Sequence, residues 1–106
     1  MIGIPVDTIL QLVGGVPAGG DRNAFVSQVC IDSREAAPGC LFAALRGERT
    51  DGHLYIGAAA AAGAVAVLAE QDAALPDLPD CCVIRVPSTL KALHALAAGY
   101  KKLFRL

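Results

Sequence analysis

The middle of the chain changes from a strand-like to a helix-like sequence and back again, and this order constrains the fold more than any other feature of the sequence. Cys40 to Leu45 (CLFAAL) is an unbroken apolar run of strand length, typical of a strand covered on both faces. An alanine-rich segment of helical composition begins near Leu54 and stops at Gly63, a residue suited to a left-handed C-terminal cap. A second apolar run, AVAVLA, occupies residues 64–69. A strand, a helix and a strand form a βαβ unit, whose right-handed crossover makes the two strands parallel.

The segments on either side extend this pattern of strands and helices. A short helix, VDTILQLV, is expected to take Asp7 as its N-cap and to stop at Gly14 and Gly15. Residues 24–31 alternate apolar with polar side chains and predict a strand. The apolar run CCVIRV, residues 81–86, predicts another strand after a surface loop.

A longer helix is expected after this last strand, with Ser88 as its N-cap. Its apolar residues recur three and four positions apart, which places on one sheet-facing side Leu90, Leu93, Ala97, Tyr100 and Phe104. Lys91, Lys101 and Lys102 are expected to face water, and His94 is assigned to core packing. The sequence therefore predicts an α/β fold, with a small mixed, mostly parallel sheet of about four strands flanked by helices.

Composition restricts the class of protein. A chain of 106 residues with 55% hydrophobic and 18% charged residues is long enough for one folded domain. The net charge of -1 argues against nucleic acid as a partner, because neutralising phosphates requires an excess of Lys and Arg. The longest uncharged apolar run, Leu54 to Ala69, is too short to cross a bilayer, and the N-terminus lacks the basic region of a secretory signal. We therefore expect a cytoplasmic protein with no membrane partner.

Four cysteines raise the alternatives of disulfides or a zinc site. They include no Cys-x-x-Cys pair, and neither histidine has metal-ligand spacing to them. We expect them to be small buried residues in a reducing compartment, and we assign no metal site.

Charged and polar residues gather in two loops, residues 32–39 and 46–53, each of which follows a predicted strand. Loops at the carboxyl ends of neighbouring parallel strands project from the same sheet edge, where open α/β sheets bind ligands. Their hydrogen-bond donors would then meet in one crevice: Ser33, Arg34, Arg46, Arg49, Thr50 and His53. Such donors suit an anionic, hydroxyl-rich ligand such as a phosphorylated nucleotide or sugar.

Each of these side chains also has a structural interpretation, and the residues alone leave both open. Asp32 and Ser33 are types that cap turns by bonding their own backbone. Arg34 could pair with a neighbouring carboxylate at the surface. Asp51 suits a helix start for electrostatic reasons, and His53 could be a neighbour of that cap.

Motifs for several catalytic chemistries are absent from the sequence. It contains no G-x-x-x-x-G-K-[ST] phosphate loop, no G-x-G-x-x-G and no G-x-S-x-G. We therefore expect binding without catalysis and assign no catalytic residue.

The segment IDSREAAPGCLFAALRGERTDGHLYIGAAAAAGAVAVLAE closely resembles the N-terminal domain of the Mur ligases, ATP-dependent enzymes that build the peptide stem of bacterial peptidoglycan. The shared pattern is Asp-Ser-Arg after a strand, then Pro-Gly-x-Leu-Phe-x-Ala-Leu-x-Gly, Asp-Gly-His and Gly-Ala-x-Ala-Val. LRGERTDGH, STLKALHALA and the early Gly14-Gly15 are more similar to the D-alanyl-D-alanine-adding ligase, MurF, than to MurE, which adds diaminopimelate or lysine. The sequence departs from the family pattern at Cys40 and Thr50.

The resemblance implies that residues 1–106 are a single N-terminal domain that binds the UDP part of UDP-MurNAc-tripeptide. The contact residues that it implies are Ser33, Arg34, Glu48, Arg49, Thr50, Asp51, Gly52 and His53. The full-length enzyme would add D-alanyl-D-alanine with ATP and Mg²⁺, on central and C-terminal domains that this chain lacks. The expected partners are thus the nucleotide sugar and the rest of the ligase, with no cofactor and no catalysis in this fragment. The alternatives are a MurE-type domain or a scaffold module that kept the fold and lost the ligand.

Overall fold

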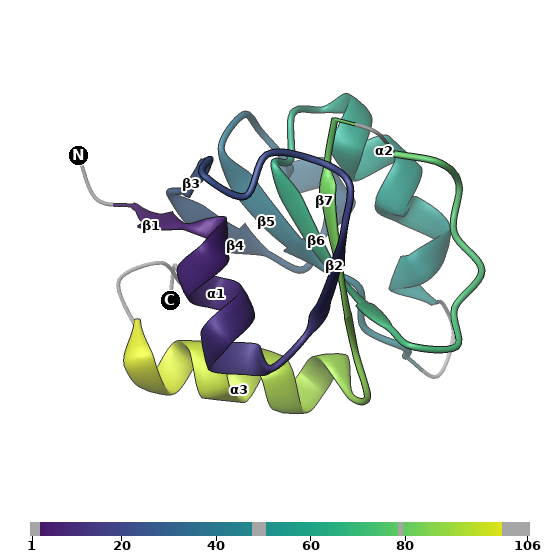
Figure 1. Ribbon diagram of the computed structural model, residues 1–106. Helices are drawn as coiled ribbons and strands as arrows, with labels where there is room; N and C mark the ends of the chain where they lie inside the picture. Colours follow the sequence, from purple (N-terminus) through teal and green to yellow (C-terminus); the bar gives the residue numbers. More distant parts are fainter. Residues whose placement is uncertain (1–2, 48–50, 79, 101–106) are drawn as a thin grey trace.

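The computed structural model in Figure 1 describes residues 3–47, 51–78 and 80–100. Its strands are β1 (Ile4–Pro5), β2 (Val16–Ala18), β3 (Phe25–Val26), β4 (Gln28–Cys30), β5 (Cys40–Ala43), β6 (Ala66–Glu70) and β7 (Cys82–Val86). Its α-helices are α1 (Val6–Val13), α2 (Ile56–Ala61) and α3 (Thr89–Gly99), and two short 3-10 helices are η1 (Ser33–Glu35) and η2 (Gly52–Tyr55).

The main sheet has five strands in the order β2-β7-β6-β5-β4. β4, β5, β6 and β7 run parallel, and β2 pairs antiparallel with β7 at one edge. α1 and α3 pack on one face of this sheet and α2 on the other (Figure 1). The predicted α/β class, with a mixed and mostly parallel sheet flanked by helices, is confirmed. The sheet has one strand more than expected.

The two faces of the central strands explain their unbroken apolar sequences. Leu41 and Leu68 point into the cluster beneath α1 and α3, whereas Phe42 and Val67 point into the cluster beneath α2. All four side chains are almost completely buried. Because both faces of β5 and β6 are covered, neither strand needs a polar face, as predicted.

The first helix starts earlier than predicted. α1 takes Pro5 as its N-cap, so Asp7 lies in the first turn and the prediction of Asp7 as N-cap is wrong. Asp7 instead forms an ion pair with Arg22, in which Arg22 Nη2 lies 3.0 Å from Asp7 Oδ1. A carboxylate in the first turn still stabilises the positive end of the helix dipole. The predicted stop is confirmed, because Gly14 adopts a left-handed conformation with φ of 65°.

The strand predicted over residues 24–31 is two short strands. β3 pairs with β1 in a separate two-stranded sheet, whereas β4 pairs with β5 in the main sheet. Between them, Ser27 donates its backbone N–H to the Gly39 carbonyl at 2.9 Å. The alternation of apolar and polar residues continues through this change of sheet, so periodicity alone did not show it.

The predicted helix near Leu54 begins with the 3-10 turn η2 and continues as α2. Gly63 follows with φ of 113°, and a Cβ there would lie 2.8 Å from the Pro38 Cα. The positive φ expected at Gly63 is therefore confirmed, and a close backbone contact requires glycine there as well, but the C-cap of α2 is Ala62, one residue before the predicted cap. The strand that follows, β6, starts two residues later than predicted.

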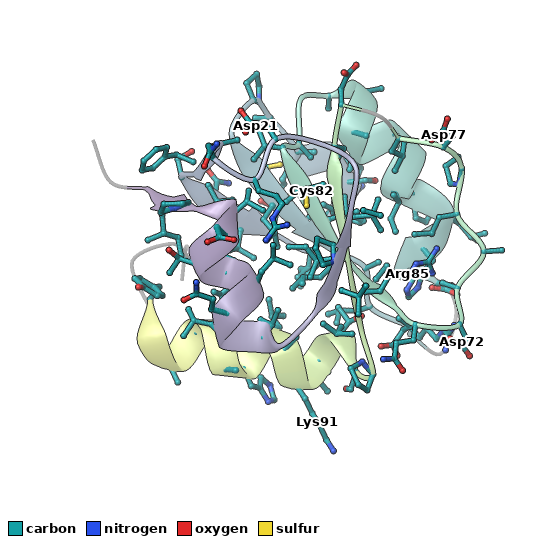
Figure 2. The ribbon with its side chains drawn as sticks, viewed as in Figure 1. Asp21, Asp72, Asp77, Cys82, Arg85 and Lys91 are labelled. Atoms are coloured by element: carbon teal, nitrogen blue, oxygen red, sulfur yellow. The ribbon has the colours of Figure 1, made fainter. Side chains whose placement is uncertain are left out.

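The predicted N-cap of α3 is confirmed, since Ser88 Oγ accepts a hydrogen bond from the Lys91 N–H at 3.3 Å. Lys91 itself points into solvent (Figure 2).

The buried face of α3 differs from the predicted one. Its most buried residues are Thr89, Ala92 and Leu96, while Leu93 and Tyr100 are partly buried. Leu90 is 52% exposed and His94 is exposed, so the predictions that they pack in the core are wrong. The helix is rotated about its axis relative to the predicted orientation, because Thr89 donates hydrogen bonds to the Glu70 carboxylate at the end of β6. Lys101, Lys102 and Phe104 lie outside the described residues.

All four cysteines are buried and free, which confirms their predicted burial. Among the described residues, no helix combines the length and apolar character needed to cross a membrane.

Candidate functional site

A cavity of about 570 Å³ lies at the carboxyl ends of β4 and β5. Its lining residues come from both polar loops and from the strand between them: Ile31, Asp32, Ser33, Arg34, Phe42, Leu45, Gly47, Gly52 and Tyr55. The two loops meet because β4 and β5 are adjacent and parallel. The expected crevice between the two loops is thus present.

The loop after β4 is shaped by Asp32. Its carboxylate caps η1 by accepting the Arg34 backbone N–H at 2.9 Å, and it also accepts the Arg34 guanidinium Nη2 at 2.7 Å. The neighbouring guanidinium lowers the pKa of Asp32 to about 2, and the carboxylate raises the pKa of Arg34. Both structural interpretations, the Asp32 turn cap and the Arg34 pair, are therefore confirmed. The Arg34 side chain is 88% exposed, so this pair adds little stability.

Ser33 lies between these two residues and lines the cavity. It is half-buried, and its hydroxyl has no hydrogen-bond partner among the residues that the structure describes. A serine hydroxyl can donate one hydrogen bond and accept two. Ser33 therefore offers the cavity an uncommitted polar group.

The loop after β5 is closed at its base by backbone contacts. Arg46 and Asp51 form an antiparallel bridge, and the Gly52 N–H donates to the Leu45 carbonyl at 2.8 Å. A Cβ on Gly52 would lie 2.9 Å from Leu45 N, so a side chain would push the loop off the strand end. Gly47 and Gly52 thus bring backbone to the cavity wall. The predicted contacts Glu48, Arg49 and Thr50 lie outside the described residues.

Arg46 was expected among the hydrogen-bond donors of the crevice, but it pairs with two carboxylates instead. Its guanidinium lies 3.0 Å from Asp72 and 3.6 Å from Asp51, and Arg46 does not line the cavity. The pKa of Arg46 is raised because of Asp72. The structure places this arginine in an ion-pair network beside the cavity.

Asp51 and His53 form a hydrogen-bonded pair on either side of Gly52, which lines the cavity. The His53 side chain is 5% exposed, and its Nδ1 lies 2.6 Å from Asp51 Oδ1. Asp51 also caps η2 by accepting the His53 backbone N–H at 3.0 Å, and these bonds lower the pKa of Asp51. His53 Nε2 accepts the Glu70 backbone N–H at 2.9 Å. Neither ring nor carboxylate lines the cavity, whereas Gly52 between them does.

The apolar lining of the cavity was missed at the sequence level. It consists of Ile31, Phe42, Leu45 and Tyr55, of which Phe42 is 1% exposed and Ile31 57%. Ile31 and Leu45 follow the ends of β4 and β5, and Tyr55 lies two residues after His53, so these positions could have indicated the lining, but apolar residues there look like ordinary core. An apolar cavity with a few polar groups at its edge suits a flat ring with hydrogen-bonding atoms.

The described part of the chain contains no cluster of three or more His, Cys, Asp or Glu side chains that could hold a metal ion.

Comparisons with known proteins agree on one family. Residues 25–101 match the profile described as "Mur ligase family, catalytic domain". The chain is 41% identical over 102 residues to the UDP-N-acetylmuramoyl-L-alanyl-D-glutamate–2,6-diaminopimelate ligase of Chlorobaculum tepidum, which covers 92% of the chain and 20% of that protein. It is 41% identical over 81 residues to the UDP-N-acetylmuramoyl-tripeptide–D-alanyl-D-alanine ligase of Mycobacterium leprae, which covers 72% of the chain and 16% of that protein.

The fold also matches solved structures. A crystal structure of MurF from Acinetobacter baumannii superposes with a TM-score of 0.77 at 24% identity, covering 92% of this chain and 21% of that one. The chain thus spans about a fifth of the length of the proteins that it matches. Since the family profile covers well over half of the chain, the chain belongs to the Mur ligase family, the ligases of peptidoglycan synthesis.

Proposed function

We propose that the cavity between the two loops binds the uridine diphosphate part of a UDP-MurNAc-peptide. The observation that carries this proposal is the shared cavity itself, because the Asp-Ser-Arg loop lines it together with Gly47, Gly52 and Tyr55 from the segment around Asp-Gly-His. Its volume of about 570 Å³ falls in the range of small-molecule sites, roughly 300–1,000 Å³.

The lining suggests how such a ligand would lie. The uracil ring would contact the apolar side chains Ile31, Leu45 and Tyr55, and its polar edge would meet backbone at Gly47 and Gly52. Ring stacking and apolar burial favour a planar base at such a wall.

The diphosphate would lie beside the loop after β4. The Ser33 hydroxyl can donate to a phosphate oxygen, and Arg34 is exposed enough to exchange its Asp32 partner for a phosphate. Glu48, Arg49 and Thr50 belong to the proposal on sequence grounds only.

For the whole enzyme we propose ATP-dependent addition of D-alanyl-D-alanine to UDP-MurNAc-tripeptide, with this chain as the N-terminal substrate domain. ATP with Mg²⁺ would activate the terminal carboxylate as an acyl phosphate, which the incoming amine attacks. Those steps would belong to other domains, so this chain alone would hold the substrate without ligating it. The Chlorobaculum tepidum relative, which covers 92% of the chain, favours a second candidate, a diaminopimelate-adding ligase.

Calorimetric titration of the chain with UDP tests the proposed ligand. We expect UDP to bind and Ser33→Ala to weaken binding roughly fivefold, since one lost hydrogen bond is worth about 1 kcal/mol. Ser27→Ala is the matched control, because Ser27 bonds Gly39 at the amino end of β5, away from the cavity lining. Equal losses in both variants, or no heat with the unchanged chain, would refute the proposed site.

The acceptor is tested separately with the full-length ligase. Phosphate release with UDP-MurNAc-tripeptide and D-alanyl-D-alanine supports the first candidate. Release only with UDP-MurNAc-dipeptide and diaminopimelate or lysine supports the second.

A further inference from the structure

A series of hydrogen bonds connects the cavity wall to the carboxyl end of β6 and then to α3. Asp51 Oδ1 lies 2.6 Å from His53 Nδ1, and His53 Nε2 accepts the Glu70 N–H at 2.9 Å. The Glu70 carboxylate continues the series by accepting the Thr89 backbone N–H at 2.7 Å and the Thr89 hydroxyl at 3.1 Å. The wall of the cavity is thereby tied to the first turn of α3.

These hydrogen bonds determine which nitrogen of the His53 ring carries the proton. Nε2 accepts a hydrogen bond from a backbone N–H and therefore carries no proton. The single ring proton lies on Nδ1 and is donated to the Asp51 carboxylate. His53 is thus neutral, with its two nitrogens in different roles.

Glu70 is held in place by its own strand β6, by α3 and by Arg85 of β7. Its backbone belongs to β6 between β5 and β7, and its carboxylate binds the start of α3. Its carbonyl accepts Arg85 Nη1 at 3.2 Å, and the same guanidinium bonds the Ala73 carbonyl in the following loop, toward which it points (Figure 2). A ligand-site loop that bonds to Glu70 is held by a rigid part of the sheet.

We propose that His53 is a positioning residue for the nucleotide cavity. Its ring holds Asp51 in place, and together the two residues fix Gly52, which lies between them in the sequence and forms the cavity wall. His53 acts through Asp51 and does not touch the ligand. The inference rests on the proposed function for its ligand, but the hydrogen-bond series itself does not.

The ring state is tested by NMR on the chain labelled with ¹⁵N-histidine. Two-bond correlations distinguish the tautomers, and we expect His53 to show protonated Nδ1 and unprotonated Nε2. His94 is an internal control, because it is exposed and has no hydrogen-bond partner among the described residues. Protonated Nε2 on His53 would overturn the proposal even if every variant failed to fold.

Two substitutions each remove one of the two hydrogen bonds of the His53 ring. Asn places its amide nitrogen near the position of Nδ1, so His53→Asn can still donate to Asp51 but cannot reach Glu70. Gln places its amide near the position of Nε2, so His53→Gln can still accept from Glu70 but loses Asp51. We expect His53→Gln to weaken UDP binding roughly tenfold, because a hydrogen bond to a charged group is lost, and His53→Asn to weaken it less, because only the bond to the neutral Glu70 N–H is lost. His94→Gln is the control and should bind like the unchanged chain.

The outcomes distinguish this inference from the proposed function. If folded His53→Gln binds UDP as tightly as the unchanged chain, the positioning role is wrong. If the unchanged chain does not bind UDP, the proposed function fails, and the Gly52 amide resonance then decides on His53 alone. That resonance should move further in His53→Gln than in His53→Asn; the same shift in both variants contradicts the proposal.

Discussion

Replacing Gly52 with alanine tests the geometry of the cavity wall. The new Cβ would lie 2.9 Å from Leu45 N, 3.0 Å from Leu45 O and 3.2 Å from the Ala44 Cα. All three are backbone atoms, and Ala44 is held to β6 by a 3.0 Å hydrogen bond from its N–H to the Leu68 carbonyl. The strand end cannot yield, so the loop must move outward.

The cost follows from two effects. Overpacking of this kind costs about 1–3 kcal/mol. Outward movement also breaks the hydrogen bond from Gly52 to Leu45, worth about 1 kcal/mol. We therefore expect Gly52→Ala to lower the free energy of unfolding by about 2–4 kcal/mol, against a total of about 5–15 kcal/mol for a domain of this size.

Urea unfolding followed by circular dichroism measures this change, and Gly57→Ala is the matched control. Gly57 lies in α2, where a new Cβ would meet nothing closer than Pro76 Cγ at 3.9 Å. Alanine there should stabilise the chain by up to about 1 kcal/mol through its higher helix propensity. If Gly52→Ala is as stable as the unchanged chain, the close contact of the loop with β5 is wrong.

Three further predictions concern separate parts of the chain. Ser88→Ala removes the cap of α3 and should lower the free energy of unfolding by about 1 kcal/mol, visible as a lower urea midpoint at unchanged slope. The pKa of Asp51 is lowered from 3.8 in the folded chain, so its contribution to stability is present above pH 3.8 and lost as the pH falls through the lower folded pKa. Asp51→Asn should therefore show a shallower loss of stability in acid, and an unchanged slope would contradict this assignment. Cys30 and Cys40 should stay free thiols under diamide, because both are buried and Cys30 pairs with Phe42, two residues beyond Cys40, so that a disulfide would require the backbone to move although the two sulfurs are 3.7 Å apart. Peptide mass spectrometry checks this prediction, and recovery of a Cys30–Cys40 disulfide from the folded chain would refute it.

The central strands could be predicted because local sequence and burial agree there. β5 and β6 are covered on both faces, and a continuous apolar run is the direct consequence. β2 could not be predicted, because Val-Pro-Ala has no period and its pairing depends on distant β7. A proline is compatible with this strand because β2 lies at the sheet edge.

The rotation of α3 shows a second limit of periodicity. Leu90 fits an apolar stripe, yet Thr89 is buried in its place because a polar contact with Glu70 sets the helix orientation. Spacing within one helix contains no information about a hydrogen bond to another element.

The location of the candidate site was predictable, but its composition was only partly so. Two polar loops after adjacent parallel strands indicated the edge of the sheet, and the cavity lies there. The walls formed by Phe42 and Tyr55 were not foreseen, because an apolar residue beside a ligand looks like one in the core. The role of His53 depends on Glu70, seventeen residues away, and no local motif shows that bond.

The most direct test of the central claim is an NMR titration of the ¹⁵N-labelled chain with UDP. The account predicts that the amide signals of Ser33, Gly47 and Gly52 shift together along one saturable curve, while those of exposed α3 residues such as His94 stay in place. Shifts confined to residues away from the cavity, or none at saturating UDP, would contradict a uridine diphosphate site between the two loops.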